Sequence, residues 1–167
     1  MKRKKTKESK LVVFVCTGNI CRSIMAEALL RHLWSDKGTH SLDLDVSSAG
    51  LHACTGSRAT DKVLFLLGEE GIDVSSHRAR QLTPEMIAEA DLILTMTRAH
   101  KAQALYMASE KDASKIKTLK EFVKIADDGD IEDPYGGDLG VYEYSLQEIR
   151  ASVLKLLAIM ENYFETP

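Results

Sequence analysis

The sequence is poor in the residues that mark several specialised protein classes. It has 3 prolines and 10 glycines among 167 residues, which excludes collagen-like, mucin-like and low-complexity disordered chains. Its 3 cysteines do not form a complete set of pairs, and Cys16 and Cys21 lie close together around a glycine, as reactive thiols in a reducing compartment do. The apolar run 11–16 is too short for a signal peptide, and no run approaches a membrane span. We therefore expect a cytoplasmic protein without a membrane segment.

Charge is distributed unevenly along the chain. The formal net charge is −3, so no overall field favours nucleic acid, and no nucleic-acid partner is expected. The stretch 2–10 reads KRKKTKESK and carries +5, which leaves −8 for the remainder. We expect residues 1–10 to form a basic disordered tail and residues 11–167 to form a single domain. Contact of the tail with an anionic surface or nucleic acid is the alternative.

Short apolar runs alternate with amphipathic stretches along the chain. Apolar runs rich in β-branched residues predict strands covered on both faces, and apolar residues at three- and four-residue spacing predict helices. Strands are predicted at 11–16, 42–48, 91–96 and 116–119, and helices at 57–69, 98–108 and 141–163, with others from 22 and 84. Ser57 and Thr83 are expected helix caps, and one helix begins after Thr97. The pattern predicts an α/β fold, a three-layer sandwich in which helices flank a four-stranded parallel sheet.

The residues that carry chemistry lie between the first strand and the first helix, in the stretch VCTGNICRS at 15–23. A loop there can turn its backbone N–H groups inward at the positive end of the helix, which suits phosphate. Gly18 and Asn19 tolerate the left-handed backbone of a tight cradle, and Arg22 can bind two phosphate oxygens at once. These features favour the thiolate form of Cys16, which by itself would be an ordinary buried cysteine. We call residues 16–23 the anion loop.

The Cys-x5-Arg-Ser spacing of the anion loop resembles that of the low-molecular-weight protein tyrosine phosphatases. Three further motifs stand in that family's order, namely Ser48-Ala49-Gly50, Ser76-His77-Arg78-Ala79-Arg80 and Asp133-Pro134-Tyr135. The resemblance covers residues 11–163. It implies the family's flavodoxin-like sandwich and makes residues 11–167 a phosphatase domain.

The resemblance also implies a reaction through a cysteinyl-phosphate. Cys16 would be the nucleophile, Arg22 would bind the transferring phosphoryl group, and Asp133 would be the general acid. Ser48 and His77 would support the shape of the loop. The rest of the anion loop would hold the phosphate, and one aromatic side chain would form a wall for the substrate. These binding residues are Thr17, Gly18, Asn19, Ile20, Cys21 and Ser23 in the loop, with Tyr135 as the wall.

The residues alone leave several alternatives open. Ser48 and His77 could be ordinary polar contacts, and Cys21 is either a small packed residue or a partner for Cys16 in a reversible disulfide. The five histidines show no ligand spacing, so no metal or other cofactor is expected. Without the resemblance, the stretch around Asp133 would be a solvated acidic loop with several rival carboxylates, which are Asp127, Asp128, Asp130, Glu132 and Asp138.

Departures from the family pattern bear on the substrate. Ile24 stands where the family usually has proline, and Ala53 and Gly136-Gly137 replace aromatic residues, which opens the mouth of the site and resembles the bacterial branch. That branch includes protein-arginine phosphatases, whose loop carries threonine where this chain has Ile20. A threonine hydroxyl there would orient the attacking water and disfavour tyrosine. Ile20 therefore favours phosphotyrosine, with phosphoarginine as the alternative.

Two other functions agree less well with the sequence. Arsenate reduction requires further cysteines after the third strand, and this chain has none beyond Cys54. A non-catalytic phosphate-binding module would be expected to lack the nucleophile, the arginine or the acid, all of which are present. The expected partner is a phosphorylated protein or peptide, and a monomer is expected although the sequence does not determine the oligomeric state.

Overall fold

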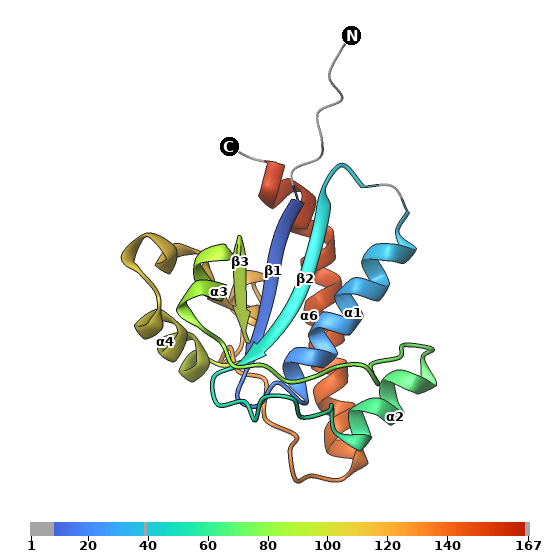
Figure 1. Ribbon diagram of the computed structural model, residues 1–167. Helices are drawn as coiled ribbons and strands as arrows, with labels where there is room; N and C mark the ends of the chain where they lie inside the picture. Colours follow the sequence, from blue (N-terminus) through green and yellow to red (C-terminus); the bar gives the residue numbers. More distant parts are fainter. Residues whose placement is uncertain (1–8, 39, 166–167) are drawn as a thin grey trace.

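The strands and helices alternate along the chain as the sequence predicts (Figure 1). This computed structural model describes residues 9–38 and 40–165. Its strands are β1 (Ser9–Cys16), β2 (Asp43–Gly50), β3 (Leu92–Thr95) and β4 (Ile116–Thr118). Its helices are α1 (Arg22–Asp36), α2 (Asp61–Glu69), α3 (Pro84–Glu89), α4 (Arg98–Met107), the 3-10 helix η1 (Glu110–Lys115), α5 (Leu119–Phe122) and α6 (Leu139–Glu165).

The four strands form one parallel sheet in the order β2-β1-β3-β4. The chain leaves β1 toward β2 on one side and later adds β3 on the other, so the strand order reverses at β1. In open parallel sheets the ligand site lies beyond the carboxyl ends of the strands at such a reversal. Cys16 pairs with Gly50 in register at the carboxyl ends of β1 and β2. The anion loop therefore begins where the topology favours a ligand site.

Alternate side chains of β1 enter two separate cores. Val12 and Phe14 join the core that contains α1 and α6, whereas Val13 and Val15 join a core that contains α3 and α4. The period of two residues along a strand places these two sets on opposite faces of the sheet. Figure 1 shows α1 and α6 on one side of the sheet and α3 and α4 on the other. The predicted three-layer α/β sandwich is confirmed.

Several boundaries differ from the sequence predictions by one or two residues, and two differences change the expected roles of particular residues. β1 begins at Ser9, where Ser9 and Lys10 pair with the start of β2, so these two residues do not belong to a tail. The remainder of the predicted tail, residues 1–8, lies outside the described residues. Ser57 was wrongly predicted to cap α2, because its carbonyl accepts a hydrogen bond from Ala79 N at 2.8 Å and the helix begins only at Asp61. No described helix combines the length and apolar character that crossing a membrane requires.

Candidate active site

Two features let the anion loop close tightly. One of its residues has a left-handed backbone conformation, and β2 carries a glycine where the loop lies against it. Asn19 has φ of 57°, a conformation that asparagine tolerates better than most residues. Gly50, at the end of β2, lies so close that a Cβ on it would be 2.6 Å from the Thr17 carbonyl oxygen and 2.9 Å from Asn19 N. The anion loop therefore rests directly on the backbone of β2, and glycine is required at that contact.

Asn19 fixes the shape of the loop from inside. Its side chain is fully buried, and its amide nitrogen donates at 2.8 Å to both Ser23 Oγ and Ser48 Oγ. Its amide oxygen accepts from Arg80 N at 3.0 Å, and its carbonyl oxygen lies 2.7 Å from His77 Nε2. Ser48 and His77 thus both contact Asn19, and the support for the loop that the resemblance implies for them stays a prediction.

The Cys16 thiol lies at the base of the loop, with only 2% of the residue exposed. Asn19 N donates to its sulfur at 3.3 Å, and Ser23 Oγ lies 3.0 Å from the same atom. Because the Ser23 oxygen accepts from the Asn19 amide, the hydroxyl proton is free to point at the sulfur. Two donors therefore converge on the sulfur, an arrangement that stabilises a thiolate.

Arg22 connects the anion loop to the segment around Ile131 and Asp133. Its Nη1 donates to the Ile131 carbonyl at 2.8 Å, and its Nη2 lies 3.4 Å from both Thr17 Oγ1 and Asp133 Oδ2. The guanidinium is buried, and its Nε has no hydrogen-bond partner within residues 9–38 and 40–165. A buried donor without a partner is costly, so an oxygen of a bound anion would satisfy it.

A cavity of about 190 Å³ lies over the thiol. The side chains of Asp133 and Tyr135 lie at its exposed side, where 67% of Tyr135 is open to solvent. Tyr135 N donates to Asp133 Oδ1 at 3.1 Å, and this hydrogen bond helps to fix the orientation of the carboxylate. The cavity brings together eight residues predicted for the site, which are Cys16, Thr17, Gly18, Ile20, Cys21, Arg22, Asp133 and Tyr135.

The structure separates Asp133 from most of its rivals in the acid segment, our name for residues 127–138. Asp127 pairs with Lys120, and Asp130 accepts from Arg98 N on α4. Asp128 and Asp138 each accept from a backbone N–H group close by in the sequence. Only Asp133, among the acidic side chains of the segment, lines the cavity and reaches Arg22.

His100 is a site residue that the sequence analysis missed. It follows β3 in the first turn of α4, is buried, and its Nε2 lies 2.8 Å from Thr17 Oγ1. Burial, and secondarily the charge of Arg22, lower its pKa from 6.5 to about 4, so the imidazole is neutral at ordinary pH. Its position just beyond the carboxyl end of a central strand was the signal that could have found it.

Cys21 lies in the cavity wall but faces the interior. Its sulfur is 3.4 Å from the Tyr142 hydroxyl on α6 and 3.9 Å from Thr60 Oγ1, and burial raises the pKa of the thiol. All three cysteines are free thiols. Pairing of Cys21 with Cys16 under oxidation remains a prediction. No group of three His, Cys, Asp or Glu side chains among the described residues could hold a metal ion.

A sequence model of the low molecular weight phosphotyrosine protein phosphatases matches residues 11–164. The chain belongs to this family. The resemblance drawn from the loop and its three companion motifs is thereby confirmed, and the chain is a phosphatase that hydrolyses phosphoric monoesters. The family implies phosphorylated proteins as substrates.

Relatives of this phosphatase carry two kinds of name. A protein-arginine-phosphatase of Geobacillus stearothermophilus is 40% identical over 146 residues, which cover 87% of this chain and 92% of that protein. A probable low molecular weight protein-tyrosine-phosphatase, EpsP of Ralstonia nicotianae, is 38% identical over 146 residues, which cover 86% of this chain and 91% of that protein. The solved structure of YfkJ from Bacillus subtilis superposes with a TM-score of 0.84 at 34% identity, covering 93% of this chain and 97% of that one.

Proposed function

We propose that the chain hydrolyses phosphotyrosine in proteins, through a cysteinyl-phosphate formed on Cys16. The observation that carries this proposal is the cavity, in which a buried thiol, a buried guanidinium and a half-exposed carboxylate line one space of about 190 Å³. A nucleophile, an anion-binding group and a proton donor are what transfer of a phosphoryl group to sulfur requires. The thiol of Cys16 and the guanidinium of Arg22 come from the anion loop, and the carboxylate of Asp133 comes from the acid segment.

In the first step the Cys16 sulfur attacks phosphorus while the bond from phosphorus to the phenolic oxygen breaks. Negative charge on the equatorial oxygens is stabilised by Arg22, whose Nε is otherwise without a partner among the described residues, and by the inward N–H groups of the anion loop. Asp133, in its protonated form, gives its proton to the departing phenolic oxygen. The products are the cysteinyl-phosphate and the dephosphorylated tyrosine.

In the second step water attacks the phosphorus and the bond from phosphorus to sulfur breaks. Asp133, now a carboxylate, takes a proton from the attacking water. The sulfur leaves as a thiolate, and Ser23, at 3.0 Å, donates a hydrogen bond to it. Inorganic phosphate is released, and the enzyme returns to its starting state without a metal or an organic cofactor.

Phosphoarginine is the second candidate substrate. The 40% identity to a protein-arginine-phosphatase supports it, because the same loop chemistry would serve a phosphorus–nitrogen bond. Ile20 supports phosphotyrosine, because its aliphatic side chain lines the cavity and offers an apolar contact to an aromatic ring rather than a hydroxyl. Ile20 lines the cavity, so it bears on the choice of substrate more directly than identity averaged over the whole chain does.

Initial rates on matched peptides test the proposal. One peptide carries phosphotyrosine and the other carries phosphoarginine at the same position, and both assays contain a chelator. We expect kcat/KM for phosphotyrosine to exceed that for phosphoarginine by at least about tenfold, a difference of ~1.4 kcal/mol in the transition state. Cys16→Ser should abolish both activities. A higher kcat/KM for phosphoarginine would overturn the substrate assignment, and turnover by Cys16→Ser would overturn the mechanism.

A further inference from the structure

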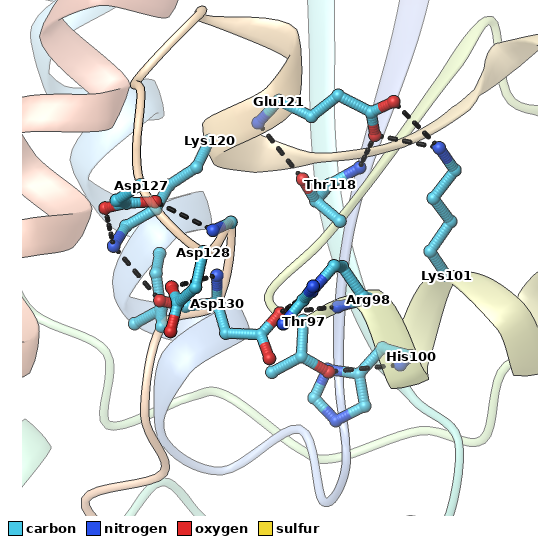
Figure 2. A network of polar contacts seen from close by, with 12 residues as sticks. Thr97, Arg98, His100, Lys101, Thr118, Lys120, Glu121, Asp127, Asp128 and Asp130 are labelled. Atoms are coloured by element: carbon cyan, nitrogen blue, oxygen red, sulfur yellow. Dashed lines mark hydrogen bonds and ion pairs between the residues drawn. The ribbon is translucent and has the colours of Figure 1, made fainter.

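Lys120, on α5, is a buried charge that the proposed reaction does not use. Only 4% of the residue is exposed, and its ammonium group has three acceptors, which matches its three protons. Figure 2 shows Lys120 beside Asp127 of the acid segment. It donates to Asp127 Oδ2 at 2.7 Å, to the Asp130 carbonyl at 3.0 Å and to Glu148 Oε1 at 3.0 Å. Burial alone would lower its pKa, but the hydrogen bonds that it donates to the two carboxylates raise the pKa, so the side chain remains charged.

These contacts join three parts of the chain that are separate in sequence. Lys120 belongs to α5, its carboxylate partner Glu148 belongs to α6, and its other two acceptors belong to the acid segment. The segment is also held by α4, where Asp130 Oδ1 accepts from Arg98 N at 2.8 Å. Lys120 therefore fastens the start of the acid segment to two helices at once.

The contact to the Asp130 carbonyl is the one that bears on the active site. The next carbonyl along the chain, that of Ile131, accepts from Arg22 Nη1 at 2.8 Å, and Ile131 N donates to the Met96 carbonyl at 2.9 Å. Two buried cations thus bind consecutive carbonyls, just ahead of Asp133. Asp133 itself is 48% exposed, and its contact to Arg22 is long, at 3.4 Å. Its position depends on how firmly the backbone before it is held.

We propose that Lys120 is a positioning residue for the acid step, because its bond to the Asp130 carbonyl sets where the carboxyl of Asp133 lies over the cavity. This inference rests on the proposed role of Asp133. A proton donor that is slightly misplaced loses much of its effect, whereas the attack of Cys16 does not depend on Lys120. The consequence is selective: loss of Lys120 slows substrates whose leaving group needs a proton.

A purely structural role makes a different prediction. If Lys120 only joined α5 to α6, its removal would lower stability and reduce turnover of every ester by the same factor. Lys120→Met is expected to lower stability whichever role holds, because it leaves the Asp130 carbonyl and two carboxylates without their buried partner, although the long apolar side chain fills the same space. The dependence of the rate on the leaving group therefore separates the two roles.

The experiment compares 4-nitrophenyl phosphate, whose phenolate leaves readily, with phenyl phosphate, whose phenolate leaves poorly without a proton. For Lys120→Met we expect kcat/KM on phenyl phosphate to fall about tenfold more than on 4-nitrophenyl phosphate, a part of the full effect of a general acid. In an Asp133→Asn background Lys120→Met should change this ratio no further. Lys101→Met is the matched control, since Lys101 pairs with Glu121 on the surface, and it should leave both rates unchanged.

The outcomes distinguish this inference from the proposed function. If Asp133→Asn itself does not increase the leaving-group dependence, the acid assignment fails. If Asp133→Asn does so and Lys120→Met slows both esters equally, the positioning role of Lys120 is overturned and the acid assignment stands. Should Lys120→Met not fold, Lys120→Leu, which also lacks a donor for the Asp130 carbonyl, is measured in the same way. An equal loss on both esters with that variant overturns the inference as well.

Discussion

At the scale of single residues, two neighbours in the anion loop have different tasks. Asn19 is turned inward, is fully buried, and holds Ser23 and Ser48 through its amide. Ile20, the next residue, contributes its side chain to the cavity wall. The first residue sets the shape of the loop, and the second contacts whatever enters the cavity. A change at Ile20 therefore tests substrate preference without removing any hydrogen bond of Asn19.

Ile20→Thr is expected to raise the ratio of kcat/KM for phosphoarginine over that for phosphotyrosine by about tenfold, since one apolar group in a pocket is worth about 1–3 kcal/mol. The substitution removes apolar contact with the tyrosine ring and adds a hydroxyl that can hydrogen-bond the attacking water. Ile20→Val is the matched control, because valine has the shape of threonine without the hydroxyl. Equal ratios in the two variants would show that the hydroxyl has no role.

At the scale of elements, the sequence predicted best where the signal was local. Thr83 and Thr97 accept capping hydrogen bonds from the backbone of the third residue after each of them, as their positions before α3 and α4 indicated. Ser57 was mispredicted because its carbonyl pairs with Ala79, and such a long-range partner leaves no trace in the local pattern. The four residues of α5 were not predicted, since a capping box at Thr118 rather than any periodicity starts that helix.

The same limit applies to the site. The residues of the anion loop are contiguous in the sequence, so the spacing of Cys16 and Arg22 could be read directly. His100 contacts Thr17 from 83 residues away. Lys120 reaches the acid segment through the Asp127 carboxylate and through the backbone carbonyl of Asp130, and no side-chain pattern reveals the second contact. Contacts between residues far apart in the sequence, and contacts to backbone atoms, are therefore what the sequence did not predict.

Gly50→Ala tests the contact between β2 and the anion loop. The new Cβ would meet backbone atoms of the loop at 2.6–3.0 Å, and backbone atoms do not move aside as a flexible side chain does. We expect the free energy of unfolding to fall by about 1–3 kcal/mol, as overpacking does elsewhere, and the displaced loop to lower kcat/KM at least about tenfold. Chemical denaturation and steady-state kinetics measure the two effects.

Gly68→Ala is the control for that experiment. Gly68 lies in α2, and a Cβ there would meet no heavy atom within 4 Å. Alanine within a helix is favoured over glycine by roughly 0.5–1 kcal/mol, so this variant should be slightly more stable and fully active. Full activity in Gly50→Ala would mean that the loop does not depend on its approach to β2.

At the scale of the whole molecule, three buried basic side chains gather near the carboxyl end of the sheet and the acid segment. Among the described residues these are Arg22, His100 and Lys120. Arg22 and Lys120 have carboxylates within ion-pair distance, at 3.4 Å and 2.7 Å respectively. His100 contacts a hydroxyl instead, and the pKa of its imidazole is lowered to about 4 by burial and by Arg22. The fold therefore contains two buried cations and one imidazole that resists protonation.

This arrangement predicts how the stability of the phosphatase depends on pH. The pKa of His100 falls from 6.5 to about 4 on folding, so between these values the unfolded chain binds a proton that the folded chain does not. Stability from this group is present above pH 6.5 and is lost as the pH falls, by about 2 kcal/mol at pH 5. In His100→Gln the amide can still bond Thr17 but does not titrate. The fall in the free energy of unfolding between pH 7 and pH 5 should therefore be smaller in the variant by about 1–2 kcal/mol.

Urea denaturation of both proteins at pH 8, 7 and 5 measures this difference, and the comparison contains its own control. Between pH 8 and pH 7 the imidazole is neutral in the folded chain and at most about a quarter protonated in the unfolded chain, which changes stability by only about 0.1 kcal/mol. The two proteins should therefore change nearly in parallel over this range. Carboxylates titrate in both proteins alike and cancel in the comparison. If the wild-type chain and His100→Gln lose the same stability between pH 7 and pH 5, His100 is able to bind its proton in the folded protein. Its contact with Thr17 would then have to survive a positive charge beside Arg22, which the buried geometry does not favour.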